Sequence, residues 1–545
     1  MKDICRLAAW CVLLLSLFGW APAAGSQEKP ASPSARMDEL FDFWNRLDQP
    51  GFAVVVVKEG RIVYQNVFGL ACQEHGVPIK PDSVFNSATL AQIFVGQAVA
   101  MLVEQGKLSL DEDVRKYIPD VPDFGAPIKL RHLLTHSSGL RDWLPVVRLR
   151  GRETEEITWE DVLAVVRAQK RPLFTPGARV QYSNTDYDLL AETVGRAAGR
   201  PFSDWAWENI FKPLKMTRTL FRDNCRAIID DQAFSYNFTR EDYLRGEDHL
   251  SLAGSHSLFT TLTDLAKWLL NLETGRVGGP ELFARMFTAV PLDDGRSSFR
   301  GYGLTVTNRP SGRQVSQMGT WAGSGAVLHY FPEDKFGFVV LGNWDYTPVS
   351  GFARDIINIY LPPPTAPREK AAPPAQPSAP LKSVKVSPEI LDRYAGDYRL
   401  GPRQVLAIRR EGDRLRLGVP GQSYALTALS ENEFLLEMAQ ARLVFPKDED
   451  GEVRRFIWKQ GGGEQTAPRI VLVRPTPKEL LEFAGAYVSE EVNMTFAIEP
   501  RGDGLVLVPP GRGEVPLVPD VKDRFTSGAS QYPAIIFERD ADGRV

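Results

Sequence analysis

The stretch from Thr89 to Glu104 constrains the fold of this chain more than any other. Apolar residues recur there at helical spacing, and further apolar residues fill the remaining faces, so the predicted helix has no polar side to turn toward water. Such a helix has to lie inside a domain. Asn86 or Ser87 can cap its start and Gly106 can end it, which puts Thr89 in the first turn.

Thr89 and Gln92 are the polar residues at the start of this helix. Residues three apart share one helix face, and the outward-pointing N–H groups of a first turn favour negative charge there. Taken alone, the pair is typical of an ordinary polar helix start. A chemical interpretation therefore depends on the sequence around it.

Two strand-hairpin patterns lie near the ends of the first 360 residues. One joins residues 53–57 to 62–64, and the other joins residues 325–330 to 336–341. Helical patterns fill the middle, most clearly at 159–169, which Thr158 can cap, and at 187–198. This order predicts an α+β domain in which one antiparallel sheet and a helical subdomain enclose a cleft.

Four blocks of sequence follow one another in this region. They are Val84-Phe85 with Thr89 and Gln92, then residues 130–139, then Pro176-Gly177 with Tyr182-Ser-Asn184, then Gln317-Met-Gly319. In this order they resemble the serine β-lactamase and penicillin-binding-protein family, in its class C β-lactamase, D-Ala-D-Ala carboxypeptidase and esterase branch. The resemblance implies a β-lactamase/transpeptidase-like fold.

The resemblance also shows where the chain departs from the family. Thr89 stands where the family has its nucleophilic serine, and Gln92 stands where it has a lysine. Gln317 replaces a lysine or histidine two residues before a glycine, Gly319. Only the Tyr182-x-Asn184 motif is intact.

These departures affect proton transfer. In the family the serine attacks a carbonyl after losing its proton to the lysine or the tyrosine. Thr89 keeps a hydroxyl but adds a methyl group that crowds it. The Gln92 amide has no nitrogen that accepts a proton near neutral pH, and Tyr182 loses the cation that would favour its phenolate.

Two hypotheses follow. The first is an exported, catalytically impaired member of the family whose cleft binds peptide or acyl ligands. The second is a working esterase, peptidase or β-lactamase with Thr89 as nucleophile and Tyr182 as base.

The resemblance implies further binding groups. Backbone N–H groups of Thr89 and Thr320 would form an oxyanion hole, and Asn184 would bond a substrate amide. Gln317 would contact a substrate carboxylate without charge, so anionic ligands should lose affinity. The expected ligand is a small peptide, an ester or a peptidoglycan-like molecule, with no cofactor.

His132 and His136 lie four residues apart, a spacing that pairs of metal-binding residues also show. No third ligand follows at a useful spacing, which favours a role in loop structure and no metal.

The chain beyond this domain divides further. Residues 36–361 are predicted as the hydrolase-like domain and 362–384 as a Pro- and Ala-rich linker. Pro388 with Tyr394-Ala-Gly396-Asp-Tyr398 reappears as Pro477 with Phe483-Ala-Gly485-Ala-Tyr487. This repeat and its alternating short strands predict two small all-β barrel modules, 385–474 and a shortened 475–545, which resemble lipocalin-like modules appended to this family.

Residues 1–24 combine a basic start, an apolar run and small residues, which predicts a cleaved secretory leader and a periplasmic or secreted protein, with an uncleaved anchor as the alternative. No other run is long enough for a membrane span. The net charge of −4 comes without a basic patch, so no nucleic-acid partner is expected. Cys72 and Cys225 remain after cleavage and can pair in an oxidising compartment.

Overall fold

The computed structural model describes residues 32–239, 242–345, 348–361, 384–401, 404–419, 422–439, 441–448, 450–460, 463–510, 513–528 and 534–545. The leader predicted at residues 1–24 lies outside this part of the chain, as does nearly all of the predicted linker. None of the helices within it has both the length and the apolar character needed to span a lipid bilayer.

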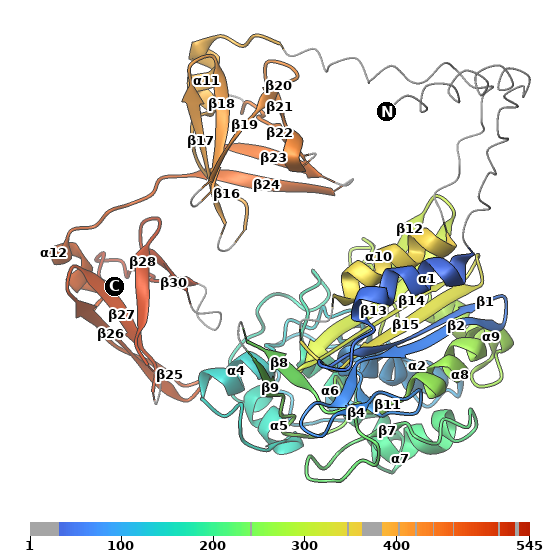
Figure 1. Cartoon of the computed structure of the whole chain (residues 1–545). Coiled ribbons are helices and arrows are strands. Elements are labelled where there is room, and N and C mark those ends of the chain that lie inside the picture. Colours follow the sequence, from blue (N-terminus) through green and yellow to red (C-terminus); the bar gives the residue numbers. More distant parts are fainter. Residues whose placement is uncertain are drawn as a thin grey trace, which may run out of the picture.

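A six-stranded antiparallel sheet forms the centre of the first domain (Figure 1). In spatial order its strands are β12 (Thr305–Arg309), β13 (Gly312–Trp321), β14 (Ser324–Phe331), β15 (Phe336–Gly342), β1 (Phe52–Lys58) and β2 (Arg61–Phe68). The predicted hairpins correspond to β1–β2 and β14–β15. They meet because β1 pairs with β15, which joins the two ends of the domain in one sheet.

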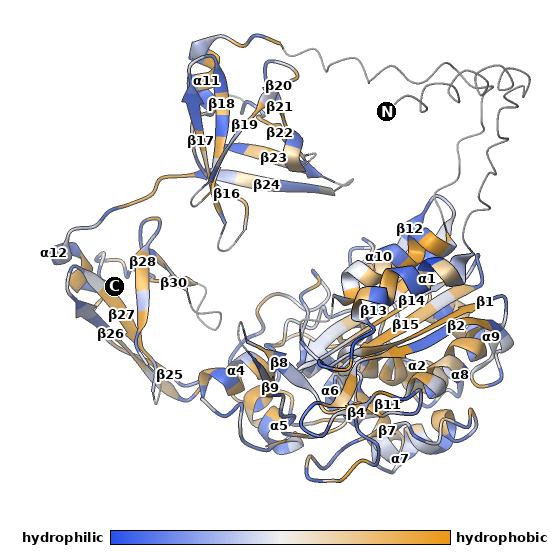
Figure 2. Cartoon of the chain, in the orientation of Figure 1, coloured by the Kyte–Doolittle hydropathy of each residue, from blue (hydrophilic) through white to orange (hydrophobic). Residues whose placement is uncertain are grey.

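The sheet is covered on both faces by helices. The helices are α1 (Pro33–Phe41) and α10 (Val349–Tyr360) on one face, and α2 (Ala91–Glu104), α8 (Leu262–Thr274) and α9 (Gly279–Met286) on the other (Figure 1). Along β1, Val54 and Val56 pack with α1 and α10, whereas Val55 and Val57 pack with α2 and α8. Alternate residues of a strand point to opposite faces, so a continuously apolar strand serves two cores. Figure 2 shows the resulting hydrophobic centre.

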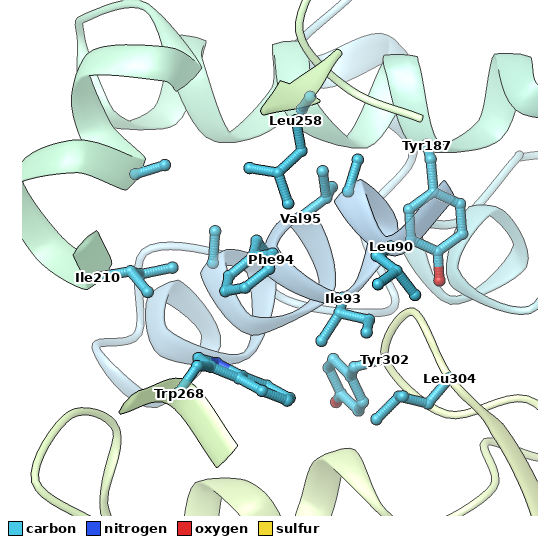
Figure 3. Packing of buried hydrophobic residues seen from close by; sticks show 14 of the residues in the cluster. Leu90, Ile93, Phe94, Val95, Tyr187, Ile210, Leu258, Trp268, Tyr302 and Leu304 are labelled. Carbon is cyan, nitrogen blue, oxygen red and sulfur yellow. The ribbon is translucent and has the colours of Figure 1, made fainter. Parts of the chain in front are cut away.

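α2 lies in the larger core, as its all-round apolar sequence predicts (Figure 3). Phe94 packs against Trp268 of α8, with ring centroids 5.4 Å apart. The α-helix starts at Ala91, two residues later than predicted, because Ala88–Leu90 form a 3₁₀ turn. Ser87 does not cap it, since its hydroxyl donates to the carbonyl of Leu258 instead.

The helical subdomain lies beside one end of the sheet (Figure 1). Its helices are α3 (Leu130–Leu134), α4 (Trp143–Leu149), α5 (Trp159–Arg167), α6 (Asn184–Ala198) and α7 (Phe202–Ala206). Thr158 caps α5 as predicted, through a capping box with Asp161. α6 starts three residues earlier than predicted, so Asn184 itself is its first residue.

Short elements complete this domain. They are the 3₁₀ turns Asp42–Trp44 and Val114–Lys116, the π-helical turn Trp207–Phe211, and strands β3 (Leu70–Cys72), β4 (Val77–Pro78), β5 (Phe85–Asn86), β6 (Ile157–Thr158), β7 (Leu220–Phe221), β8 (Tyr236–Phe238), β9 (Tyr243–Arg245), β10 (Leu250–Ser251) and β11 (Leu258–Thr260). Cys72 and Cys225 are both free thiols in this structure.

The first C-terminal module is a barrel-like sheet that follows a short helix, α11 (Pro388–Tyr394). Its strands are β16 (Gly396–Arg399), β17 (Val405–Glu411), β18 (Arg414–Val419), β19 (Gln422–Ala425), β20 (Thr427–Ala428), β21 (Glu433–Leu436), β22 (Ala441–Val444), β23 (Arg455–Gln460) and β24 (Gly463–Ile470). The backbone N–H of Leu426 donates to Leu415, linking the segment after β19 to β18.

The second module repeats this plan with fewer strands. It begins with α12 (Pro477–Leu480) and continues with β25 (Gly485–Ser489), β26 (Met494–Arg501), β27 (Gly504–Val508), β28 (Val515–Pro519), β29 (Arg524–Ser527) and β30 (Ala534–Ile536). Tyr398 donates its hydroxyl to the carbonyl of Tyr394, and Tyr487 donates to the carbonyl of Phe483. The same bond thus recurs at equivalent positions of the repeat found in the sequence.

Candidate functional site

Thr89 lies in the 3₁₀ turn between β5 and α2. The preceding residue, Ala88, has φ of +50°, a left-handed conformation that non-glycine residues rarely adopt without support. The side-chain oxygen of Asn86 accepts the Ala88 N–H at 3.0 Å and supplies that support. The turn therefore presents Thr89 through a strained backbone that its surroundings hold in place.

The hydroxyl of Thr89 donates to the carbonyl oxygen of Met318 on β13 at 3.0 Å. A Cβ atom at Gly319 would lie 2.0 Å from the same hydroxyl, so the approach of β13 requires glycine at this position. Within the described residues, no lysine or histidine side chain is hydrogen-bonded to this oxygen. Its proton is thus directed at a backbone carbonyl, which is not a base.

Gln92 and Gln317 meet beside Thr89. Gln317 Nε2 donates to the carbonyl oxygen of Thr89 at 3.1 Å and to Oε1 of Gln92 at 3.0 Å. Both glutamine side chains are buried. The three residues are therefore in contact, and a neutral amide pair lies beside Thr89.

Tyr182 connects this pair to α6. Its hydroxyl accepts a hydrogen bond from Gln92 Nε2 at 2.8 Å and donates to Oδ1 of Asn184 at 2.9 Å. Asn184 Nδ2 in turn donates to Asp142 at 2.9 Å. Each of these hydrogen bonds is therefore donated in the direction from Gln92 to the Asp142 carboxylate, away from Thr89.

The electrostatics of Tyr182 disfavour a phenolate. Desolvation raises its pKa above the usual value of 10 even though the residue is 41% exposed, and the hydrogen bond from Gln92 only partly opposes this. The His136 ring lies 4.6 Å from the Tyr182 ring, but burial lowers the pKa of His136 to about 3, so it is neutral and supplies no positive charge. Tyr182 is therefore a phenol at neutral pH.

The two histidines of the 130–139 block contact different carboxylates. His132 Nε2 lies 3.2 Å from Asp293, and His136 Nδ1 lies 3.3 Å from Asp186. In the part of the chain that the structure describes, no three or more His, Cys, Asp or Glu side chains are grouped to hold a metal ion. His132 thus links α3 to the segment that contains Asp293, and His136 links the residues after α3 to α6.

Gly319 and Thr320 follow Met318 on β13, in register with Ala326 and Gly325 of β14. Gly319 contacts Thr89, as described above, and Thr320 is the next residue along the strand. The structure therefore brings all seven predicted site residues to the region where the 3₁₀ turn, β13 and the start of α6 meet.

Two residues of this region escaped the sequence analysis. Asp142 caps α4 and holds Asn184, and its only sequence signal is an acidic residue before a helix. Asp248 is 8% exposed and pairs with Arg222, which is 7% exposed, at 2.8 Å. It also accepts hydrogen bonds from Asn86 and Trp321. Nothing in the sequence near Asp248 points to this role.

Comparisons with known proteins agree with this fold. A family model described as "Beta-lactamase" matches residues 38–360. Penicillin-binding protein 4* of Bacillus subtilis (strain 168) is 26% identical over 455 residues, which cover 79% of this chain and 98% of that protein. Esterase EstB of Burkholderia gladioli is 34% identical over 202 residues, or 34% of this chain and 51% of the esterase.

A further relative is the D-alanyl-D-alanine-carboxypeptidase/endopeptidase AmpH of Escherichia coli (strain K12), 28% identical over 40% of this chain and 56% of that protein. Among solved structures, the octameric penicillin-binding protein homologue from Pyrococcus abyssi superposes with a TM-score of 0.55 and 21% identity. It covers 88% of this chain and 98% of that chain. A class C beta-lactamase matches with a TM-score of 0.50 and 19% identity, over 60% and 96% of the two chains. At these sequence identities, the similarity to the two solved structures shows a shared fold alone.

Proposed function

The chain belongs to the β-lactamase family, and from that premise we propose that it is an exported member whose cleft binds peptide or acyl ligands and turns them over poorly or not at all. The observation that carries this proposal is the hydrogen bond of the Thr89 hydroxyl to the Met318 carbonyl. Acyl transfer needs a base at that oxygen, and the side chain in the lysine position, Gln92, is an amide.

The expected loss of activity is large. Removing a nucleophile or its base costs on the order of 10⁴- to 10⁶-fold in turnover in well-studied hydrolases. The alternative, a working hydrolase, requires Tyr182 to take the proton of Thr89. Its raised pKa and the direction of its hydrogen bond to Asn184 both oppose that role.

Ligand binding does not need a base. An oxyanion hole made of backbone N–H groups, proposed here for Thr89 and Thr320, is independent of side-chain identity. Asn184 is fixed between Tyr182 and Asp142, which suits a rigid wall of a cleft. The relative named D-alanyl-D-alanine-carboxypeptidase/endopeptidase favours a peptide as the ligand class.

The proposal extends to the organisation of the chain. We assign a leader to residues 1–24, a hydrolase-like domain to 36–361, a linker to 362–384, and lipocalin-like modules to 385–474 and 475–545. The repeated tyrosine hydrogen bond supports equivalent origins for the two modules.

Isothermal titration calorimetry with a short acylated D-amino peptide tests binding. Gln317 uses both protons of its amide on Thr89 and Gln92, and it brings no cation to a ligand carboxylate. The C-terminal amide of the peptide should therefore bind at least as tightly as its free carboxylate. Gln317→Lys should favour the carboxylate form by several-fold, since charge-assisted hydrogen bonds are about twice as strong as neutral ones.

Ser316→Ala, at the neighbouring position of the same strand, is the matched control and should leave both affinities unchanged. Absence of binding by both peptide forms would contradict a retained cleft, whereas peptide hydrolysis at a rate usual for the family would contradict the proposed loss of turnover.

A further inference from the structure

The loop between β25 and β26 of the second module contacts the helical subdomain of the first domain. The Arg141 guanidinium lies 2.9 Å from Glu491, and the backbone N–H of Lys170 donates to Glu491 Oε1 at 2.9 Å. Arg150 Nε donates to the carbonyl of Val492 at 2.9 Å. Three separate segments of the subdomain therefore hold two adjacent residues of one loop, close to where Figure 1 shows β25 beside α4.

Apolar side chains from both partners also pack across this contact. Val492 packs against the cluster formed by Trp143, Val146 and neighbouring residues of the helical subdomain. Leu149 of α4 packs in the opposite direction, against the core of the second module. Each partner thus packs one apolar residue against the apolar cluster of the other.

This contact lies next to the residues that support the candidate site. Arg141 precedes Asp142, whose carboxylate holds Asn184. The carbonyl of Arg141 accepts the hydroxyl proton of Thr185, so the loop is also fixed to α6. One side of this loop faces the candidate site, and the other is bound by the second module.

We propose that the second C-terminal module is an intramolecular brace, docked through Glu491 and Val492 on the loop and helix that support Asn184 and Tyr182. The docking is independent of the proposed function. Only its consequence for a ligand in the cleft rests on that function.

The contacts should contribute unequally to the docking of the second module. The side chains of Arg141 and Glu491 are 24% and 22% exposed, so water and salt weaken their attraction. The apolar packing and the bonds to backbone groups are not screened in this way. Val492→Asp should therefore loosen the contact more than Glu491→Gln, which keeps an oxygen that can accept the Lys170 N–H.

Hydrogen exchange of the full chain, followed by mass spectrometry, tests the brace without any ligand or activity. The amide of Lys170 reports directly, because Glu491 is its acceptor. Glu491→Ala and Val492→Asp should each accelerate exchange at Lys170 and in residues 141–150 by about tenfold or more, whereas Glu491→Gln should change it little.

Asp503→Lys, in the exposed turn between β26 and β27, is the charge control and should match the wild-type protein. Leu149→Asp disrupts the same contact from the side of the first domain. If either Leu149→Asp or Val492→Asp fails to fold, the other still tests the brace. Wild-type exchange rates at Lys170 in Leu149→Asp or Val492→Asp would overturn the brace. A ligand-binding failure of the kind considered above would leave these rates unchanged, so the two proposals fail separately.

Discussion

Gln317 donates to the side chain of Gln92 and to the carbonyl of Thr89, so the two buried amides lie together beside Thr89. A buried amide left without a partner costs about 1–3 kcal/mol, so the two substitutions away from the family pattern depend on each other. A lysine at residue 92 would bring a charge to this pair and a base to Thr89. The chemistry of the site thus rests on one side chain and its partner.

Replacing Thr89 with serine and Gln92 with lysine tests whether these two side chains limit acylation. The double variant removes the crowding methyl group and supplies an amine, so its acylation by a fluorescent penicillin should rise by about 10²-fold or more over wild type. Stopped-flow or gel fluorescence measures the rate. Thr89→Ser alone, which still lacks the base, is the control and should gain little. A double variant as inert as wild type would count against the position assigned to the nucleophile.

The turn of Ala88–Leu90 and the strand β13 are separate elements that one buried carboxylate connects. Asp248 accepts from Asn86, which supports Ala88, and from Trp321 at the end of β13. Its counter-ion is Arg222. Asp248 therefore holds both the turn that contains Thr89 and the strand whose carbonyl accepts the Thr89 hydroxyl.

Asp248→Asn would leave the Arg222 guanidinium buried without a counter-charge. Breaking a buried ion pair in this way costs about 3–5 kcal/mol, which urea unfolding followed by tryptophan fluorescence should detect. Adding Arg222→Met to the same chain removes the unpaired charge and should recover part of that loss. A single variant as stable as wild type would show that this ion pair is not what holds the two elements.

Sequence predicted the long, periodic elements well and the short ones poorly. The hairpins β1–β2 and β14–β15 and the capping box of α5 follow from local patterns. α2 starts later than its sequence pattern predicts, because the 3₁₀ turn depends on contacts with Leu258 and Asp248 from distant parts of the chain. Local propensity carries no information about such contacts.

At the scale of the whole molecule, the ordered motifs indicated which residues lie together, whereas the network that supports them could not be predicted. Asp142 and Asp248 look like ordinary surface carboxylates in the sequence, and only the folded chain brings them to Asn184 and Asn86. The repeat was visible from spacing. The contact of Glu491 with Arg141 joins residues 350 positions apart (491 − 141) and leaves no local pattern.

The most direct test of the central claim is a covalent-labelling measurement on the wild-type full chain. Incubation with a fluorescent penicillin and with an activated aryl ester, followed by peptide mass spectrometry, reports whether residue 89 is acylated. Because the Thr89 hydroxyl has a carbonyl as its partner and, among the described residues, no lysine or histidine bonded to it, we predict no adduct on Thr89. An adduct on Thr89 in the wild type that disappears in Thr89→Ala would contradict the account.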